Sequence, residues 1–174
     1  MNYLKTLVEI ALFKGKPHDI AYNISYPIIA FIVALFVGVS AATAVGNIST
    51  PISFVFVQLI SLGLFFYLIL VASDKISRFV QSASSLYGTI ALFQISAYLL
   101  IFIFRVSPLA TFIYLWSAVV QIYIFRETLE CKTLKAVALY AGIQFSTNLL
   151  LLMMFPELIE ILQKSMAPPT QSNS

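Results

Sequence analysis

The side chains that could carry out chemistry are few in this chain, and they stand between long apolar segments. His18 is the only histidine and is followed directly by Asp19, so the two could act as an acid–base pair. Adjacent residues in a turn point in different directions, however, and no third group that would orient the imidazole is evident. We therefore interpret His18 as a solvated loop residue.

Cys131 is the only cysteine, so an intramolecular disulfide is excluded. Basic neighbours such as Arg126 and Lys132 would favour its thiolate form and make it reactive toward oxidants or a palmitoyl donor. Glu127 and Glu130 oppose this effect because they partly cancel the positive field. The sequence therefore favours an unreactive loop thiol.

Ionisable groups that could support catalysis within a membrane are absent from the apolar segments. No Asp, Glu, Lys, Arg or His lies in the middle of any of them, although buried ionisable groups usually mark a proton relay, an ion path or a substrate site. No paired acids or metal-ligand cluster accompany His18. We therefore expect no enzymatic activity, no metal and no cofactor.

The composition indicates the medium in which these segments fold. Of the 174 residues, 60% are hydrophobic and 10% are charged, whereas a soluble domain has about 25% charged residues. A small globular domain cannot bury so much apolar surface, so this surface must face lipid. The net charge of +3 does not indicate nucleic-acid binding, because the basic residues are scattered in short polar segments.

Five apolar stretches are long enough to cross a bilayer, whose hydrocarbon core needs about 20 helical residues. None of the seven prolines lies in their interior, as expected because a proline inside a helix leaves a backbone group unpaired in lipid. We expect an all-α polytopic membrane bundle of about five transmembrane helices. The predicted transmembrane domain is 27–155, with spans 27–46, 52–72, 84–104, 108–125 and 134–155.

The third and fourth spans are separated only by a short polar segment. Residues 83–125 contain one charge, Arg105, which is followed by Val106, Ser107 and Pro108. A single helix of that length would be about twice as long as the bilayer is thick. We therefore predict a tight hairpin at Arg105 to Pro108.

Polar segments flank the spans on both sides. Within the amino-terminal segment 1–26, the periodicity of residues 3–14 predicts an amphipathic helix that lies along the inner membrane surface. The C-terminal tail, 156–174, has from Ser165 onward a composition typical of disorder. The apolar stripe of the amphipathic helix consists of Leu4, Leu7, Val8 and Ala11.

The basic residues predict the orientation of the chain. With the amino terminus in the cytoplasm, eight basic residues are cytoplasmic and two, Arg105 and Lys164, lie on the other side. Short cytoplasmic loops carry the excess of Lys and Arg in membrane proteins. We expect a multi-pass protein of the cell inner membrane with an extracytoplasmic carboxyl terminus. The eight are Lys5, Lys14, Lys16, Lys75, Arg78, Arg126, Lys132 and Lys135.

The first span carries a small residue at every fourth position, namely Ala34, Gly38, Ala42 and Gly46. Small residues at this spacing form a groove that lets another helix approach closely, and close packing drives helix association in lipid. The sequence leaves open whether this helix-packing groove is filled within the bundle or by another protein. Internal packing is the simpler interpretation.

Uncharged polar residues recur inside the predicted spans. The favoured interpretation is interhelical hydrogen bonding, which contributes about 1 kcal/mol or less for each bond. The alternative is a polar track that lines a small conduit. Because amides do not change charge, transport along such a track would be passive or externally driven. The main intramembrane polar residues are Gln58, Gln94, Gln121, Gln144 and Asn148.

Two short motifs carry a resemblance to a known family. Residues 14–22 read Lys-Gly-Lys-Pro-His-Asp-Ile-Ala-Tyr and precede the first span, and residues 78–88 read Arg-Phe-Val-Gln-Ser-Ala-Ser-Ser-Leu-Tyr-Gly and lead into the third. With this layout the chain resembles the small bacterial inner-membrane proteins grouped with the Yip1 domain. The resemblance implies about five spans and a cytoplasmic amino terminus, and it implies no catalytic residues.

These features are typical of a membrane protein that binds other molecules rather than converting them. We expect an interaction or scaffold component in the bilayer, with membrane lipids and other membrane proteins or further copies of itself as partners. The expected contact surfaces are the groove of the first span, segment 3–14 and the basic loops around Arg78 and Lys132. The alternative is a permease or channel-like protein that passes a small neutral solute or a lipid.

Overall fold

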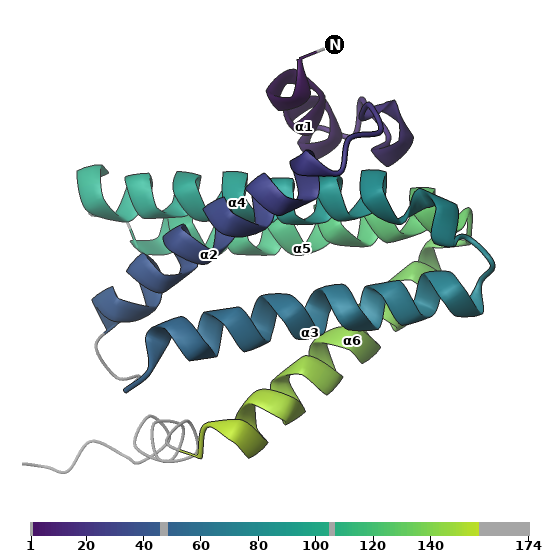
Figure 1. The fold of residues 1–174 in the computed structure, drawn as a ribbon. Helices are drawn as coiled ribbons and strands as arrows, with labels where there is room; N and C mark the ends of the chain where they lie inside the picture. Colours follow the sequence, from purple (N-terminus) through teal and green to yellow (C-terminus); the bar gives the residue numbers. More distant parts are fainter. Residues whose placement is uncertain (1, 46–48, 105–106, 157–174) are drawn as a thin grey trace, which may run out of the picture.

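A computed structural model describes residues 2–45, 49–104 and 107–156, and all regular structure within these ranges is helical (Figure 1). Three predicted features, Gly46 of the packing groove, Arg105 of the hairpin and the tail beyond Pro156, fall outside the described residues. The α-helices are α1 (Tyr3–Ala11), α2 (Ser25–Val45), α3 (Pro51–Ala72), α4 (Phe79–Phe104), α5 (Ser107–Leu129) and α6 (Thr133–Met154), and the short 3-10 helices are η1 (Pro17–Asp19) and η2 (Ile76–Arg78).

Four helices in the described part of the chain are long and apolar enough to cross a membrane. The protein is therefore a membrane-embedded all-α bundle, as the sequence predicts. The predicted span 108–125 lies in α5, which is a helix but is not one of these four, so its crossing of the membrane stays a prediction. The four segments are Ser25–Thr43, Pro51–Ala72, Ile76–Ile101 and Thr133–Met154.

Large apolar side chains on the outside of the bundle agree with this environment. Phe36 of α2, Phe112 of α5 and Phe145 of α6 are each exposed over more than two thirds of their surface, at 71%, 71% and 72%. Contiguous apolar surface of this kind does not persist in water, whereas in a bilayer it contacts acyl chains.

Helix α4 is the central element of the bundle. It packs against α2 and α5, and its first half also contacts α1. Helices α3 and α6 pack against each other. In addition, α3 contacts α2, and α6 contacts α5. Figure 1 shows α4 and α5 as separate helices lying side by side. The core joins Phe66 of α3, Leu86 of α4 and Phe125 of α5, with the rings of Phe66 and Phe125 centred 4.7 Å apart.

The first half of α4 is buried on every side, without interruption from Ser82 to Ile90. Its hydroxyls are accommodated because they donate to carbonyl oxygens one turn earlier, as Ser85 does to Gln81 at 3.0 Å and Thr89 does to Ser85 at 2.8 Å. The helix begins at Phe79, five residues before the predicted span 84–104.

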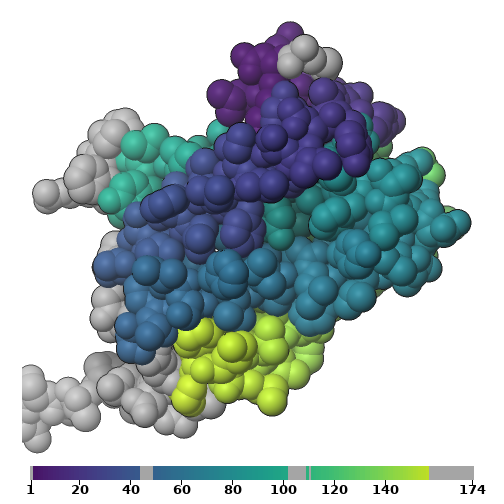
Figure 2. Space-filling model, viewed as in Figure 1, coloured from purple at the N-terminus to yellow at the C-terminus, as the bar shows by residue number. Residues whose placement is uncertain are grey.

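Helix α1 forms within the predicted segment and ends at Ala11, and one of its faces packs against the bundle. Leu7 and Ala11 are buried, whereas Leu4 and Val8 are exposed and the other buried positions are Thr6 and Ile10. The helix is rotated because Gly88 of α4 leaves room for Tyr3 and Leu7, and the Tyr3 hydroxyl donates to the Ser84 carbonyl oxygen at 2.8 Å. Figure 2 shows this amino-terminal part standing out from the bundle.

Candidate functional site: the charged end of the bundle

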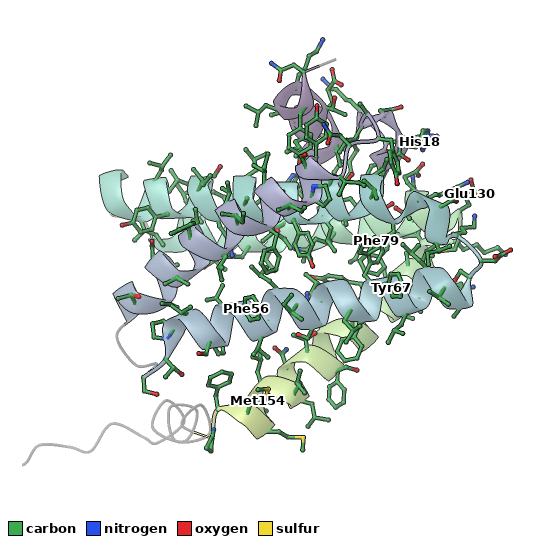
Figure 3. All side chains as sticks on the ribbon, viewed as in Figure 1. His18, Phe56, Tyr67, Phe79, Glu130 and Met154 are labelled. Carbon is green, nitrogen blue, oxygen red and sulfur yellow. The ribbon has the colours of Figure 1, made fainter. Side chains whose placement is uncertain are left out.

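Three connections of the chain meet at one end of the bundle. They are the segment between α1 and α2, the turn between α3 and α4, and the turn between α5 and α6. Figure 3 shows His18 and Glu130 at this end and Met154 at the other. The sequence predicted that these three connections share one side of the membrane, and the structure brings them together. We call this region the charged end.

Glu130 links two of the connections. Its carboxylate accepts hydrogen bonds from Lys75 Nζ and, at 2.6 Å, from Arg78 Nη2, while Arg78 Nη1 donates to the Thr128 carbonyl oxygen at 3.1 Å. The hydrogen bonds from Lys75 and Arg78 lower the pKa of Glu130 from 4.5 to about 2. The turn before α4 is therefore tied to the turn before α6.

The backbone at Glu130 shows that this link is built into the turn. Glu130 has a φ of 51°, in the left-handed region where glycine is favoured after a helix. The turn closes through the Cys131 amide, which donates to the Arg126 carbonyl oxygen at 3.2 Å. A side chain in this conformation is disfavoured by about 1–2 kcal/mol. From this turn the carboxylate of Glu130 reaches Lys75 and Arg78.

Glu127 forms a second centre at the same end. Arg126 Nη2 lies 2.6 Å from its Oε1, and Lys16 Nζ lies 3.5 Å from its Oε2. The Arg126 hydrogen bond is the main reason why the pKa of Glu127 is lowered, although partial burial works in the opposite direction. The segment after α1 is thus connected to the end of α5.

Three side chains of α4 and α5 hold the backbone of the segment after α1. Trp116 Nε1 donates to the Ala11 carbonyl oxygen at 3.0 Å, the Tyr123 hydroxyl to that of Gly15 at 3.1 Å, and Gln81 Nε2 to that of Ile20 at 2.9 Å. Sequence reasoning missed these contacts. Tyr123, near the end of the predicted span 108–125, was a usable signal because aromatic residues with a polar atom are typical of a membrane boundary, whereas Trp116 lies in the middle of that span.

The predicted loop residues do not form a catalytic arrangement. His18 Nε2 lies 3.9 Å from Asp19 Oδ1, both side chains are exposed, and the other Asp19 oxygen accepts from the Lys16 amide at 2.6 Å. Cys131 is a half-buried free thiol. Within the described residues, no three His, Cys, Asp or Glu side chains are placed to hold a metal ion.

The predicted helix-packing groove lies inside the bundle where its residues are described. Ala34 and Gly38 are buried, and Ala42 packs against the core from its edge. A Cβ on Gly38 would lie 2.7 Å from Val55 Cγ1 of α3, so the absence of a side chain there permits the close approach of the two helices.

The intramembrane polar residues are spread over different surfaces. Gln58 and Asn148 are exposed, Gln121 donates to Ser117 on its own helix at 3.1 Å, and Gln144 is hydrogen-bonded to Tyr140 on its own helix. The Oε1 atoms of Gln94 and Gln121 and the hydroxyl of Thr147 are buried without a hydrogen-bond partner.

Comparisons with known proteins return no matching family model, no matching curated protein and no matching solved structure. The resemblance to Yip1-domain proteins therefore stays a prediction.

Proposed function

We propose that this protein is a non-enzymatic membrane component that binds a partner protein through the charged end. The observation that supports the proposal is that two carboxylates of this end, Glu127 and Glu130, are bound in ion pairs. The carboxylates of Glu127 and Glu130 each form ion pairs with two basic side chains, and the lowered pKa of each carboxylate makes it a weak base. These groups fix three connections into one surface instead of serving a reaction.

Exposed lysines surround the fixed ion pairs. Lys14 in the segment after α1 and Lys132 in the turn before α6 are both exposed. Lys135 is exposed one turn further along α6. Their positive field is complementary to an acidic segment of a partner, which it would attract and orient.

The partner surface is narrower than the sequence predicted. The groove of α2 is packed within the bundle at Ala34, Gly38 and Ala42, and Arg78 is bound to Glu130 and Thr128. The amphipathic helix α1 has one face against α4, so only its outer face is accessible. Of the predicted basic loops, the one around Lys132 is therefore the main contact in our proposal.

The predicted orientation is part of the same proposal. The charged end collects Lys16, Lys75, Arg78 and Arg126, and an excess of basic residues in short loops is typical of the cytoplasmic side. We place the charged end in the cytoplasm, and the partner segment with it. The inner membrane and the extracytoplasmic carboxyl terminus remain parts of this proposal.

Photo-crosslinking tests the proposal at two positions of one helix. A photoreactive residue replaces Leu134, which is 81% exposed beside Lys132 and Lys135, and as a matched control it replaces Met153, 76% exposed at the far end of α6. We expect a discrete protein adduct from position 134 only. The adduct should persist in a Lys132→Arg, Lys135→Arg variant and disappear in a Lys132→Glu, Lys135→Glu variant. The proposal would be contradicted if both positions gave the same adducts, or if the adduct from position 134 persisted in the Lys132→Glu, Lys135→Glu variant.

The unpaired oxygens of Gln94 and Gln121 support a second candidate, a conduit for a small neutral solute. A solute donor could satisfy two buried acceptors on adjacent helices. This candidate predicts that a Gln94→Leu, Gln121→Leu variant loses flux in reconstituted vesicles, whereas Gln58→Leu, on the exposed surface, keeps it. Equal flux in wild type and both variants would exclude it.

A further inference from the structure

A cavity at the charged end has walls that change from apolar to charged along its length. It encloses about 420 Å³ between the segment after α1, the last turns of α5 and the start of α6. We propose that this cavity binds the headgroup of an anionic phospholipid, whose acyl chains leave along α5 into the bilayer. The cavity is lined by Phe13, Lys16, Val119, Ile122, Arg126 and Glu127, among others.

The charged part of the cavity attracts an anion. Lys16 and Arg126 supply two positive charges, and Glu127 supplies one negative charge, so the wall carries one net positive charge. Arg126 is held in place by the ring of Tyr123, whose centroid lies 5.1 Å from the guanidinium carbon. A guanidinium with remaining N–H groups is suited to two-point binding of a phosphate.

The apolar part of the cavity is formed by Val119 and Ile122 of α5 together with Phe13. Val119 is about two helical turns before Arg126 on α5 and is half exposed, so this wall opens toward lipid. Ile122 lies between them and is partly buried. The cavity wall therefore changes from apolar to charged in the same order as a phospholipid, whose acyl chains, glycerol and phosphate follow one another from the hydrocarbon core to the surface.

The outer wall is rigid because aromatic side chains hold it. Phe13 has a φ of 59°, and its ring lies 5.2 Å from that of Trp116 and 5.1 Å from that of Tyr123. Trp116 and Tyr123 also bind the backbone on both sides of Phe13 through Ala11 and Gly15. The cavity is therefore formed before a ligand arrives, which reduces the entropy lost on binding.

The occupant is a lipid rather than a free anion because of the apolar wall. Inorganic phosphate would contact Lys16 and Arg126 only, and it would leave Phe13, Val119 and Ile122 without an apolar ligand. The inference does not depend on the proposed partner protein, which contacts Lys132 and Lys135. The two proposals can therefore fail separately.

Native mass spectrometry of the full chain tests the site directly. The protein is reconstituted with phosphatidylglycerol and phosphatidylcholine of identical acyl chains, and retained lipids are counted at low salt and at about 0.5 M salt, where diffuse surface attraction is screened. We expect one phosphatidylglycerol retained at both salt concentrations. Inorganic phosphate and glycerol phosphate should not displace it.

Matched charge variants locate the lipid. A Lys16→Gln, Arg126→Gln variant and a Lys132→Gln, Lys135→Gln variant each lose two positive charges at the same end of the bundle. At high salt the first should lose the lipid by more than about tenfold, whereas the second should keep it within about twofold. Equal losses in both variants, or displacement by inorganic phosphate, would overturn the proposal.

A third variant should bind the lipid more tightly rather than more weakly, and this test does not require the Lys16→Gln, Arg126→Gln variant to fold. Glu127→Gln removes the negative charge, so the cavity wall gains one net positive charge and the phosphatidylglycerol concentration needed for half-maximal retention should fall by about fivefold. If the ion pairs were only structural, the same substitution would leave retention unchanged or lower it.

Discussion

The two halves of α4 have opposite surroundings and opposite compositions. From Ser82 to Ile90 every residue is buried, and this half contains three serines, a threonine and a glycine. From Ile95 onward the helix exposes large apolar side chains, among them Leu99 and Ile101. In a soluble protein the apolar half would be the buried one. Here the small and hydroxyl-bearing half forms the centre of the bundle.

This difference shows which interaction assembles the bundle. Lipid solvates an apolar side chain as well as another helix does, so burial of Leu or Ile gives little advantage, whereas small residues let backbones approach closely. The buried half of α4 accordingly contacts α1 through Ser84 and Tyr3, α2 through Tyr87 and Phe31, and α5 through Ser82 and Thr128.

The largest effect is expected from a larger apolar residue in the buried half. Ser85 is fully buried, so Ser85→Leu should destabilise the protein by about 3 kcal/mol through overpacking, although it makes the helix more hydrophobic. Leu99→Ala, in the exposed half, should change stability by less than about 0.5 kcal/mol. Reversible unfolding in mixed micelles measures both. A stabilised Ser85→Leu protein would contradict the comparison.

A close helix contact predicts the next effect. A Cβ on Gly63 of α3 would lie 1.9 Å from the hydroxyl of Tyr87, a buried group that donates to the Leu59 carbonyl oxygen at 3.1 Å. Gly63→Ala should therefore destabilise by about 2 kcal/mol. Gly142 of α6 has open space around it, so Gly142→Ala serves as control and should be neutral or stabilising by up to about 1 kcal/mol, since alanine favours the helix.

A smaller effect is expected where α1 meets α4. A Cβ on Gly88 would lie 2.6 Å from the Tyr3 hydroxyl and 2.7 Å from Leu7 Cδ1, and both of these side chains can shift. Gly88→Ala should displace α1 at a cost of about 1 kcal/mol and leave the other helices in place. Faster hydrogen exchange confined to residues 3–11 checks this. Uniformly faster exchange would show that α1 is not a separate docking unit.

The smallest effect is expected from the exposed link at Glu130. Because the pKa of its carboxylate is lowered to about 2, its contribution is present above pH 4.5 and is lost as the pH falls from 4.5 toward 2. Hydrogen exchange in the turn at 75–79 should accelerate over this range, and less so at high salt because the group is exposed. Glu130→Gln should remove the pH dependence, whereas Glu9→Gln on α1 should keep it.

The helices themselves could be predicted from sequence because span length and proline position are local constraints. Pro51 opens α3 as expected, and the separation of α4 from α5 follows from bilayer thickness. The face of α1 could not be predicted, because periodicity permits either Leu4 and Val8 or Thr6 and Ile10 as the inner pair. The choice depends on Gly88, which is 78 or more residues away from all of them.

The candidate site was predictable in its location but not in its connections. Basic loops around Arg78 and Lys132 mark the charged end in the sequence. Which cation binds which carboxylate depends on the register of two turns, and the pairing of Lys75 and Arg78 with Glu130 has no sequence signal. The cavity beside Glu127 likewise requires Phe13 to adopt a left-handed backbone conformation, which could not be predicted from the sequence.

The central claim is that the three connections of the charged end lie on one side of a membrane. Single cysteines at Lys14, Ser77 and Lys132, and at Met154 as the opposite end, are introduced into a Cys131→Ser protein and labelled with a membrane-impermeant thiol reagent in vesicles of known orientation. We expect the cysteines at positions 14, 77 and 132 to be labelled from the cytoplasmic face and the cysteine at position 154 to be labelled from the other face. Labelling of any one of the first three from the face that labels position 154 would contradict this claim.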